Sequence, residues 1–486
     1  MEIASPRSGR FLAPSRARSR IDAKHLLAVL LLLALNAAVK LPVWELHPQI
    51  FSDSAGYIVP ALSLVSGRGY GVQQDGFRTP TYPLFLALVL LPSDTTHLAT
   101  CQDAHRPACL GSAAQSHDGA AAIQVIAIVQ ILLGGGILLL LYLLGWRLTH
   151  NRLIAVLSGA GYAFNLAAAF WENSILTETL TTLLLLLAVY LVIRGTELGG
   201  RGRIALGAIL GALALCHSLY LLYWGVPALF LFIYRERTSW RSALMRILPV
   251  VLIPALCILA WSAFNYFVNG VLTPSTLSGY VLIQMVAPVV EKAPPGYDYI
   301  TEIYVGFRNA MMQETGSDSG AIFRAWPAMI DATGLTWSQI SAKLTNLALY
   351  LIGIEPLVYL HSVWIGWQRF WDFALYHYDP IPATLPGAAG FTDDAWQSLM
   401  NILFWAASFL LTLITALRSR IARLAPPPLG PILLVMLTVW FAAVFASATN
   451  FQDNARLRAS VLPLQYATIL YTLWLAGTLI ARRRKG

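Results

Sequence analysis

The sequence predicts an all-α protein that crosses a membrane several times. Of its 486 residues, 57% are hydrophobic and only 12% are charged, and the mean hydropathy is +0.62. A soluble domain carries about 25% charged residues. Several hydrophobic stretches also reach the roughly 20 residues that a membrane-spanning helix requires. These observations exclude an ordinary soluble enzyme and the disordered and fibrous classes.

Eight stretches are clear candidates for membrane helices because each is hydrophobic over most of its length. They are residues 26–44, 120–144, 153–171, 176–193, 247–267, 399–417, 431–448 and 461–480. Residues 204–234 are longer and have basic residues beyond both ends, so both ends should lie on the same side of the membrane. We expect this stretch to form a hairpin of two short helices, broken near Cys216, His217 and Ser218.

Charge sets the expected orientation. The net charge of +9 is concentrated beside the hydrophobic stretches, which is typical of signals that orient membrane helices and argues against nucleic acid as a partner. Segments assigned to the cytoplasm carry 22 basic and 4 acidic residues, whereas the outer segments carry 10 basic and 20 acidic residues. This contrast predicts about ten transmembrane helices with both termini in the cytoplasm.

Two further stretches are expected to stay on the outer side. Residues 81–91 would form only about 16 Å of helix. The basic segments before residue 26 and after residue 144 both belong in the cytoplasm, and the stretches 26–44 and 120–144 already supply the two crossings between them. Residues 81–91 should therefore lie at the membrane surface. Residues 344–367 are long enough to cross, but Glu355-Pro356 interrupts them and an extra crossing would break the parity.

Four regions follow from this topology. Residues 1–25 form a basic cytoplasmic tail, and 26–267 a transmembrane module whose first outer loop is 45–119. Residues 268–397 form a second outer segment with amphipathic helices, and 398–486 the last transmembrane helices with a basic cytoplasmic tail. Loops as long as the two outer segments usually fold and carry function.

The cysteines suggest one covalent link and no metal site. Cys101 and Cys109 share the first outer loop, where oxidation is permitted, so we hypothesise a disulfide between them. Cys216 and Cys257 lie within hydrophobic stretches, and no cysteine or histidine spacing typical of a metal site occurs.

The densest group of polar and aromatic residues lies in the first outer loop. It contains Asp-Ser-x-x-Tyr at 53–57, Gly-x-Gly-Tyr at 67–70 and Arg-x-Pro-x-Tyr-Pro at 78–83. This series resembles the first outer loop of C-type (GT-C) glycosyltransferases. The similarity is to the branch that contains the protein O-mannosyltransferases and the lipid A aminoarabinose transferase.

Later segments resemble further motifs of that family in the same order. They are Leu-Thr-Glu-Thr-Leu at 176–180, the Gly- and Leu-rich stretch 207–234, Trp-Ser-Ala-Phe-Asn at 261–265, and Asn-Ala-Arg-Leu-Arg at 454–458 with Pro463. The chain departs from the family at two places. His217-Ser218 stands where the family often has a basic residue after a Thr, and Phe264 replaces the usual Arg.

The resemblance implies an integral membrane glycosyltransferase of a bacterial inner (plasma) membrane. It would transfer a sugar from a polyprenyl-phosphate donor, a membrane lipid, to a glycan, lipid or protein acceptor at the outer face. No cofactor is predicted, although some relatives with more acidic outer loops use a divalent metal ion.

The resemblance also assigns roles to residues. Asp53 would act as the base or would orient the acceptor, and Glu178 would be a second acidic group near donor or acceptor. An acceptor hydroxyl needs a proton acceptor, and guanidinium groups suit a phosphate leaving group. The candidates for the donor phosphate are Arg78, Arg456 and Arg458. The candidate substrate contacts are Tyr57, Tyr82 and His217.

Each of these residues also has a structural interpretation. The two carboxylates suit the capping of helix N-termini, and the two C-terminal arginines suit anchoring at the membrane interface. Arg78 could pair with Asp75, His217 could fill a helix break, and the tyrosines could pack near the interface.

Two other functions are alternatives to the transfer of a sugar from a polyprenyl-phosphate donor. A ligase or polymerase of lipid-linked glycans would concentrate catalytic Arg and His in a late outer loop, whereas here the first loop is the richer one. A lipid or solute transporter tends to have paired repeats and a site at mid-membrane, and neither is evident in this sequence.

Overall fold

The computed structural model describes residues 23–41, 44, 49–70, 78–95, 98, 117–195, 198–233, 239–372, 394–417, 429–450 and 453–484. Within these ranges the secondary structure is helical, and the β-pairing consists of one isolated parallel bridge between Gln49 and Ser174. The predicted all-α class is therefore confirmed.

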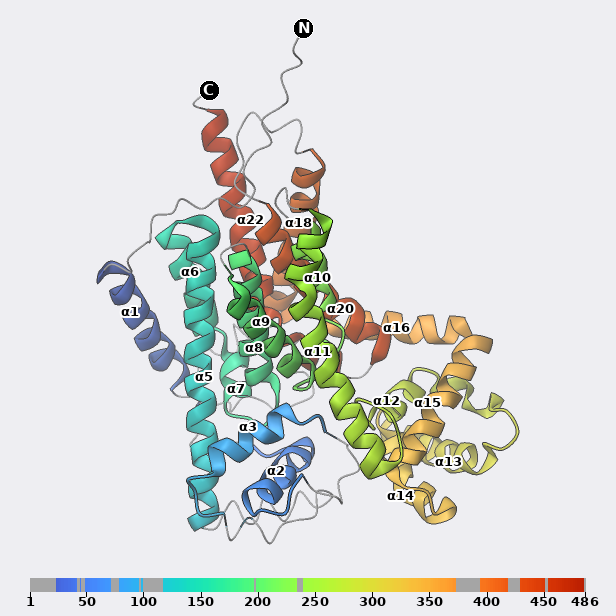
Figure 1. Ribbon diagram of the computed structural model, residues 1–486. Coiled ribbons are helices and arrows are strands. Elements are labelled where there is room, and N and C mark those ends of the chain that lie inside the picture. Colours follow the sequence, from blue (N-terminus) through green and yellow to red (C-terminus); the bar gives the residue numbers. More distant parts are fainter. Residues whose placement is uncertain are drawn as a thin grey trace.

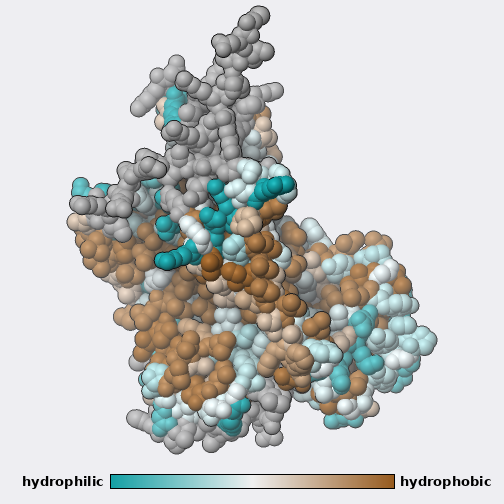
Figure 2. Space-filling view, viewed as in Figure 1, coloured by the Kyte–Doolittle hydropathy of each residue, from teal (hydrophilic) through white to brown (hydrophobic). Residues whose placement is uncertain are grey.

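Hydrophobic helices, most of them long, form a bundle (Figure 1). Its members are α1 (Ala23–Lys40), α5 (His117–Thr149), α6 (Arg152–Ala163), α7 (Leu166–Glu172), α8 (Glu178–Arg194), α9 (Gly200–Ala214), α10 (Gly225–Ile233), α11 (Trp240–Asn269), α18 (Asp394–Ala416), α20 (Gly430–Thr449) and α22 (Leu462–Arg483). Leu, Ile, Val, Ala and aromatic side chains from these helices fill one continuous core. Many leucines nevertheless face outward, and Figure 2 shows broad hydrophobic surface over the bundle. Such a surface is suited to lipid, because a soluble protein rarely exposes so large an apolar patch.

By length and composition, six of the described helices can cross a membrane: α1, α5, α11, α18, α20 and α22. The number reaches eight if α6 with α7, bent by 59°, and α15 with α16, bent by 107°, each count as one span. The structure thus supports a polytopic membrane protein with six to eight candidate spans. The expected ten-helix topology rests on charge parity, because α8 has only 17 residues and α9 only 15.

The predicted breaks coincide with helix ends. Helix α9 ends at Ala214, and a short 3-10 helix, η3 (Ser218–Tyr220), follows before α10 begins. Glu355 separates α15 (Trp337–Ile354) from α16 (Pro356–Phe370), as expected from the proline that follows it.

Two shorter helices, α2 (Ser52–Val65) and α3 (Thr81–Leu90), pack on each other at the end of the bundle remote from the C-terminal end of α22 (Figure 1). Their core side chains join those of α5 and α7 in a second hydrophobic cluster. Helix α3 covers the stretch expected to lie at the membrane surface. It places Arg78, three residues before its first residue, against α2.

A compact helical lobe follows α11. It contains α12 (Ser278–Gln284), η4 (Ala287–Lys292), α13 (Asp298–Thr315), α14 (Ala321–Thr333) and α15. The rings of Tyr280 and Trp337 stack at 3.9 Å in its core, which is separate from that of the bundle. Helices α12 and α15 approach so closely that a Cβ atom at Gly279 would lie 1.9 Å from the carbonyl oxygen of Ser341. Residues 278–354 thus form a folded unit that lies beside the bundle (Figure 1).

Candidate functional site

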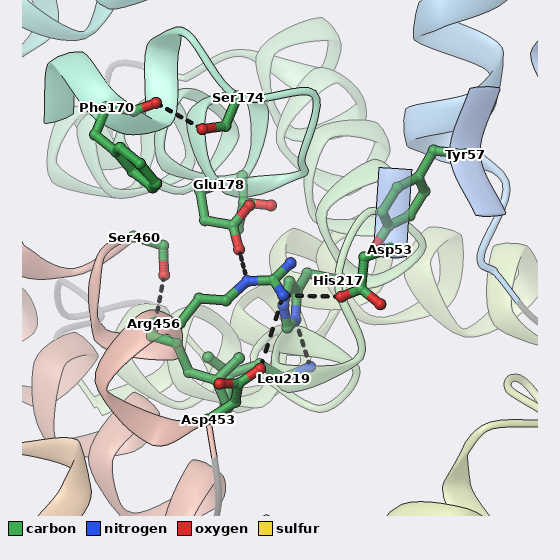
Figure 3. A network of polar contacts seen from close by, with 12 residues as sticks. Asp53, Tyr57, Phe170, Ser174, Glu178, His217, Leu219, Asp453, Arg456 and Ser460 are labelled. Carbon is green, nitrogen blue, oxygen red and sulfur yellow. Dashed lines mark hydrogen bonds and ion pairs between the residues drawn. The ribbon is translucent and has the colours of Figure 1, made fainter. Parts of the chain in front are cut away.

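Four charged residues from distant parts of the chain meet at one place. Arg78 Nη2 lies 2.6 Å from Oδ1 of Asp53, and Arg456 Nη1 lies 2.8 Å from Oδ2 of the same carboxylate. Arg456 also donates through Nε to Oε1 of Glu178. The result is an alternating chain, Arg78–Asp53–Arg456–Glu178, which we call the charge cluster. Figure 3 shows its Asp53, Arg456 and Glu178 members. A fifth charge, Asp453, lies 3.8 Å from Arg456 at its edge.

Local structure explains how Asp53 reaches the cluster. Asp53 is the second residue of α2, and Ser54 Oγ accepts a hydrogen bond from the backbone N–H of Phe51 at the start of the helix. The carboxylate of Asp53 is thus left to bind the two arginines. Tyr57 lies one turn later on the same face and contacts Arg78, whose guanidinium carbon is 4.8 Å from the ring centroid.

Glu178 and Arg456 are fixed by the helices that carry them. Glu178 is the first residue of α8, and Arg456 lies in the short helix α21 (Asn454–Arg458) that precedes α22. Only 4% of the Glu178 side chain and 9% of the Arg456 side chain are exposed, compared with 35% for Asp53. Asp53 is therefore the carboxylate of the cluster that an approaching substrate reaches most readily.

The electrostatics keep Asp53 ionised. Burial alone would raise the pKa of its carboxyl group, but the charges of Arg78 and Arg456 outweigh burial and hold this pKa below its ordinary value. An isolated carboxylate with so low a pKa is a weak proton acceptor. In this state Asp53 is better suited to orienting a hydroxyl than to deprotonating it.

His217 lies beside the cluster as a neutral donor. It occupies the break between α9 and η3, and its Nδ1 accepts a hydrogen bond of 3.2 Å from the backbone N–H of Leu219. Burial, and then the charges of Arg456 and Arg78, lower the pKa of its imidazole to about 3. The ring is therefore uncharged near neutral pH, and the proton on Nε2 can be donated to a ligand.

The two candidate tyrosines are buried and connect the cluster to the protein interior. Tyr57 and Tyr82 meet edge to face at 5.1 Å, and the Tyr82 hydroxyl donates to Oε1 of Gln130 at 2.7 Å. Gln130 in turn donates to the carbonyl oxygens of Glu172 and Ser174. These contacts hold the turn that leads into Glu178.

Arg458 does not join the charge cluster. Its fully buried side chain donates to Oδ1 of Asn401 at 3.0 Å and to the carbonyl oxygen of Asp372 at 2.5 Å. Gln465 donates to the same Asn401 oxygen. Arg458 thus ties α18 to α22 in a network of its own, although it is only two residues from Arg456.

A second buried ion pair was missed from the sequence. Lys40 Nζ lies 2.7 Å from Oε1 of Glu172, and neither side chain is exposed. Glu172 also accepts hydrogen bonds from Trp44 Nε1 at 2.9 Å and from the Tyr162 hydroxyl at 2.6 Å. A Cβ atom at Gly134 would lie 2.2 Å from Glu172, so α5 needs glycine there. The sequence did contain a signal for this pair. Lys40 and Glu172 each lie at the end of a hydrophobic stretch, and charged residues in such positions are rarely without a partner.

Phe264 lies in a group of aromatic rings. Phe264 stacks on Trp261 at 5.0 Å, and Tyr70 packs edge to face against both rings. The Tyr70 hydroxyl donates to the carbonyl oxygen of Arg78 at 3.1 Å. Tyr70 thus links the segment that follows α2 to α11 through ring packing.

A small pocket adjoins the charge cluster at Glu178. It lies where α5, α6, α7, α8 and the start of α22 meet, and it is lined mainly by apolar and aromatic side chains together with Thr179 and Thr182. The cluster therefore has a cavity on its Glu178 side.

The remaining sequence expectations concern cysteines and metals. Cys101 and Cys109 lie outside the described residues, whereas Cys216 and Cys257 are free thiols. No group of three His, Cys, Asp or Glu residues in the described ranges is arranged to hold a metal ion.

No known protein family matches the sequence of this chain, and no curated protein matches it. Among solved structures, the chain is similar to the archaeal oligosaccharyltransferase AglB from Archaeoglobus fulgidus, in complex with an inhibitory peptide and a dolichol-phosphate. The TM-score is 0.45 and the sequence identity 12%, over 95% of this chain and 52% of that structure. The chain thus spans about half the length of AglB, and roles for its residues must come from its own geometry.

Proposed function

We propose that the protein is an integral membrane glycosyltransferase of GT-C type. It transfers a sugar from a polyprenyl-phosphate donor to an acceptor hydroxyl at the outer face of the membrane. The observation that carries the proposal is the bridging position of Arg456, which contacts Asp53 and Glu178 while Arg78 contacts the other oxygen of Asp53. Four segments singled out by motif resemblance, at 53–57, 78–83, 176–180 and 454–458, supply these residues.

The cluster has the groups that such a reaction requires. The bond between the anomeric carbon and the phosphate oxygen breaks, and a bond from the acceptor oxygen to the anomeric carbon forms. Arg78 and Arg456 bind the phosphate that leaves with the pair of electrons. Asp53 accepts the hydrogen bond, and finally the proton, of the acceptor hydroxyl.

Donor binding and proton transfer are coupled in this scheme. In the free protein, both arginines neutralise Asp53 and keep its pKa low. When the donor phosphate binds to the same two guanidinium groups, they stabilise the negative charge of Asp53 less. The pKa of Asp53 therefore rises. The carboxylate thus becomes a better base when donor is present.

Helix direction supports an outward-facing site. Helix α8 starts in the cluster with Glu178 and ends at Arg194, and α22 starts just after the cluster and ends at Arg482 and Arg483. The basic helix ends thus point away from the cluster, and basic ends favour the cytoplasm. This direction agrees with a lipid-linked donor that is used on the opposite side.

Loss of either cluster arginine is expected to weaken binding of polyprenyl phosphate. Arg78→Gln or Arg456→Gln removes a charge-assisted contact, which contributes about 1.5–3 kcal/mol, or roughly 10- to 150-fold in affinity. The dissociation constant is measured with purified protein in nanodiscs. Arg324→Gln, which changes an exposed arginine of the lobe, is the matched control. Unchanged affinity in both cluster variants would refute the assignment of the phosphate site.

The low pKa of Asp53 predicts how transfer depends on pH. Because Asp53 stays ionised well below the ordinary carboxyl pKa of about 3.9, its protonation should not reduce kcat/KM between pH 8 and pH 5. Arg78→Gln removes a neighbouring positive charge, so the pKa of Asp53 should rise and any acid-side loss should move to higher pH. The prediction would be contradicted if kcat/KM of the wild-type protein fell on acidification with a midpoint above pH 5 and this fall were absent from Asp53→Asn.

A further inference from the structure

We infer that helix α16, together with the end of α15, lies in the membrane leaflet on the side of the charge cluster and docks the lobe onto lipid. This inference concerns how the protein sits in the membrane and does not depend on the proposed reaction. Helix α15 ends at Ile354, and the chain turns by 107° into α16. Figure 1 shows α16 lying across the direction of the long helices α5 and α11. A helix in this orientation can lie along a membrane surface without crossing the bilayer.

One face of α16 is apolar and exposed. Leu357, Leu360 and Trp364 are each more than half exposed. Their spacing of three and four residues places them on one side of the helix. Leu349 and Ile354, in the last two turns of α15, are exposed as well. Figure 2 shows hydrophobic surface at the edge of the molecule where Figure 1 places α16. A contiguous apolar surface of this kind marks a site of contact with lipid or with another protein.

The lack of charge on α16 favours lipid over water. Residues 356–368 contain no Asp, Glu, Lys or Arg, and the exposed polar side chains of α16 are those of His361 and Gln368. Helix α13 of the same lobe, by contrast, carries four charged residues among its 18. A helix at a protein surface in water carries charged residues on its outer face. The outer face of α16 is instead suited to the boundary between lipid headgroups and acyl chains.

The opposite face of α16 is fixed to the end of a candidate membrane span. The Tyr359 hydroxyl donates to the carbonyl oxygen of Ala448 at 2.8 Å, and Asn454 Nδ2 donates to the carbonyl oxygen of Gly366 at 2.8 Å. Ala448 is the last residue but one of α20, whose 20 residues form about 30 Å of helix, the thickness of the hydrocarbon core. The end of α20 therefore marks the edge of the hydrocarbon, and α16 lies at that edge.

The same contacts connect the membrane surface to the charge cluster. Asn454 is the first residue of α21, the short helix that carries Arg456. Because α16 holds α21 at the edge of the hydrocarbon, it keeps Arg456 near the depth of the lipid headgroups. Lipid is the occupant that this position favours, since the exposed face of α16 adjoins the end of a membrane span.

Spin labels test which medium covers the exposed face. A nitroxide is attached to Leu357→Cys, Leu360→Cys and Trp364→Cys in the whole chain, reconstituted in nanodiscs. Power-saturation EPR measures collision rates with oxygen, which concentrates in hydrocarbon, and with a polar nickel chelate, which stays in water. Met312→Cys, at an exposed position of α13, is the control for water, and Leu132→Cys, at an exposed position in the middle of α5, is the control for lipid. Wild-type protein treated in the same way gives the signal of the native cysteines, and equal melting temperatures verify that each variant is folded.

We expect the ratio of oxygen to nickel collisions at the α16 positions to exceed that at Met312→Cys at least about fivefold, because hydrocarbon excludes the polar chelate. The ratio should approach that at Leu132→Cys, and two of the three α16 positions suffice if one variant fails to fold. A ratio equal to that at Met312→Cys would show that this face meets water. Rare collisions with both reagents would show that another part of the protein, or a second copy, covers it. Either of these two results would overturn the inference.

Discussion

Asp53→Asn is expected to reduce kcat/KM for sugar transfer by about 10²- to 10⁴-fold, the usual contribution of a general base. Asparagine keeps the shape of the side chain and can accept a hydrogen bond from one arginine. It cannot hold a negative charge between Arg78 and Arg456 or accept a proton from the acceptor. The rate is measured with purified protein and a polyprenyl-phosphate sugar, once an acceptor is identified.

The matched control is Asp453→Asn, which makes the same chemical change beside the same arginine. Asp453 lies 3.8 Å from Arg456 and is 45% exposed, whereas Asp53 lies at 2.8 Å. We expect the control to retain activity within about fivefold, since exposed ion pairs contribute at most about 1 kcal/mol. Full activity in Asp53→Asn, or equal losses in the two variants, would remove Asp53 from the reaction.

Lys40→Met is expected to cause the largest loss of stability of any single substitution discussed here, about 3–5 kcal/mol in the free energy of unfolding. It leaves the Glu172 carboxylate buried without its cation, while Trp44 and Tyr162 still donate to it. The carboxylate cannot escape to water because its side chain is fully buried. Denaturant unfolding in detergent micelles, followed by tryptophan fluorescence, measures the effect.

Two controls separate this effect from a simple change of side chain. The double variant Lys40→Met with Glu172→Gln removes both charges and should recover most of the lost stability. Arg324→Met breaks an exposed ion pair with Glu314 and should change the free energy of unfolding by less than about 1 kcal/mol. A Lys40→Met variant as stable as Arg324→Met would show that the buried pair does not hold α1 to the bundle.

Most helices and two of their breaks could be predicted because they depend on local sequence. The 59° bend between α6 and α7, inside the expected span 153–171, was not predicted. Hydrophobic length identified the eight main stretches, and the proline after Glu355 identified the break between α15 and α16. The shared helical face of Asp53 and Tyr57 followed from their four-residue spacing, and both side chains contact Arg78. The number of crossings could not be settled in this way, because α8 and α9 are shorter than a standard span.

The partners within the site could not be predicted, because they are far apart in the sequence. Arg456 and Glu178 are separated by 278 residues, and Lys40 and Glu172 by 132. Arg456 and Arg458 were grouped because they are neighbours. Positions two apart on a helix do not share a face, so the two side chains enter different networks. Helix geometry alone could have signalled that only one of them would face the cluster.

The most direct test is sugar transfer by the wild-type protein in proteoliposomes. The vesicles contain a polyprenyl phosphate that carries a radiolabelled monosaccharide, and candidate acceptors are added outside. The account predicts that label appears on an acceptor while polyprenyl phosphate is released, and that Asp53→Asn slows both at least about 10²-fold. Movement of the labelled lipid or solute across the bilayer without any transfer of label would contradict it and would favour a transporter.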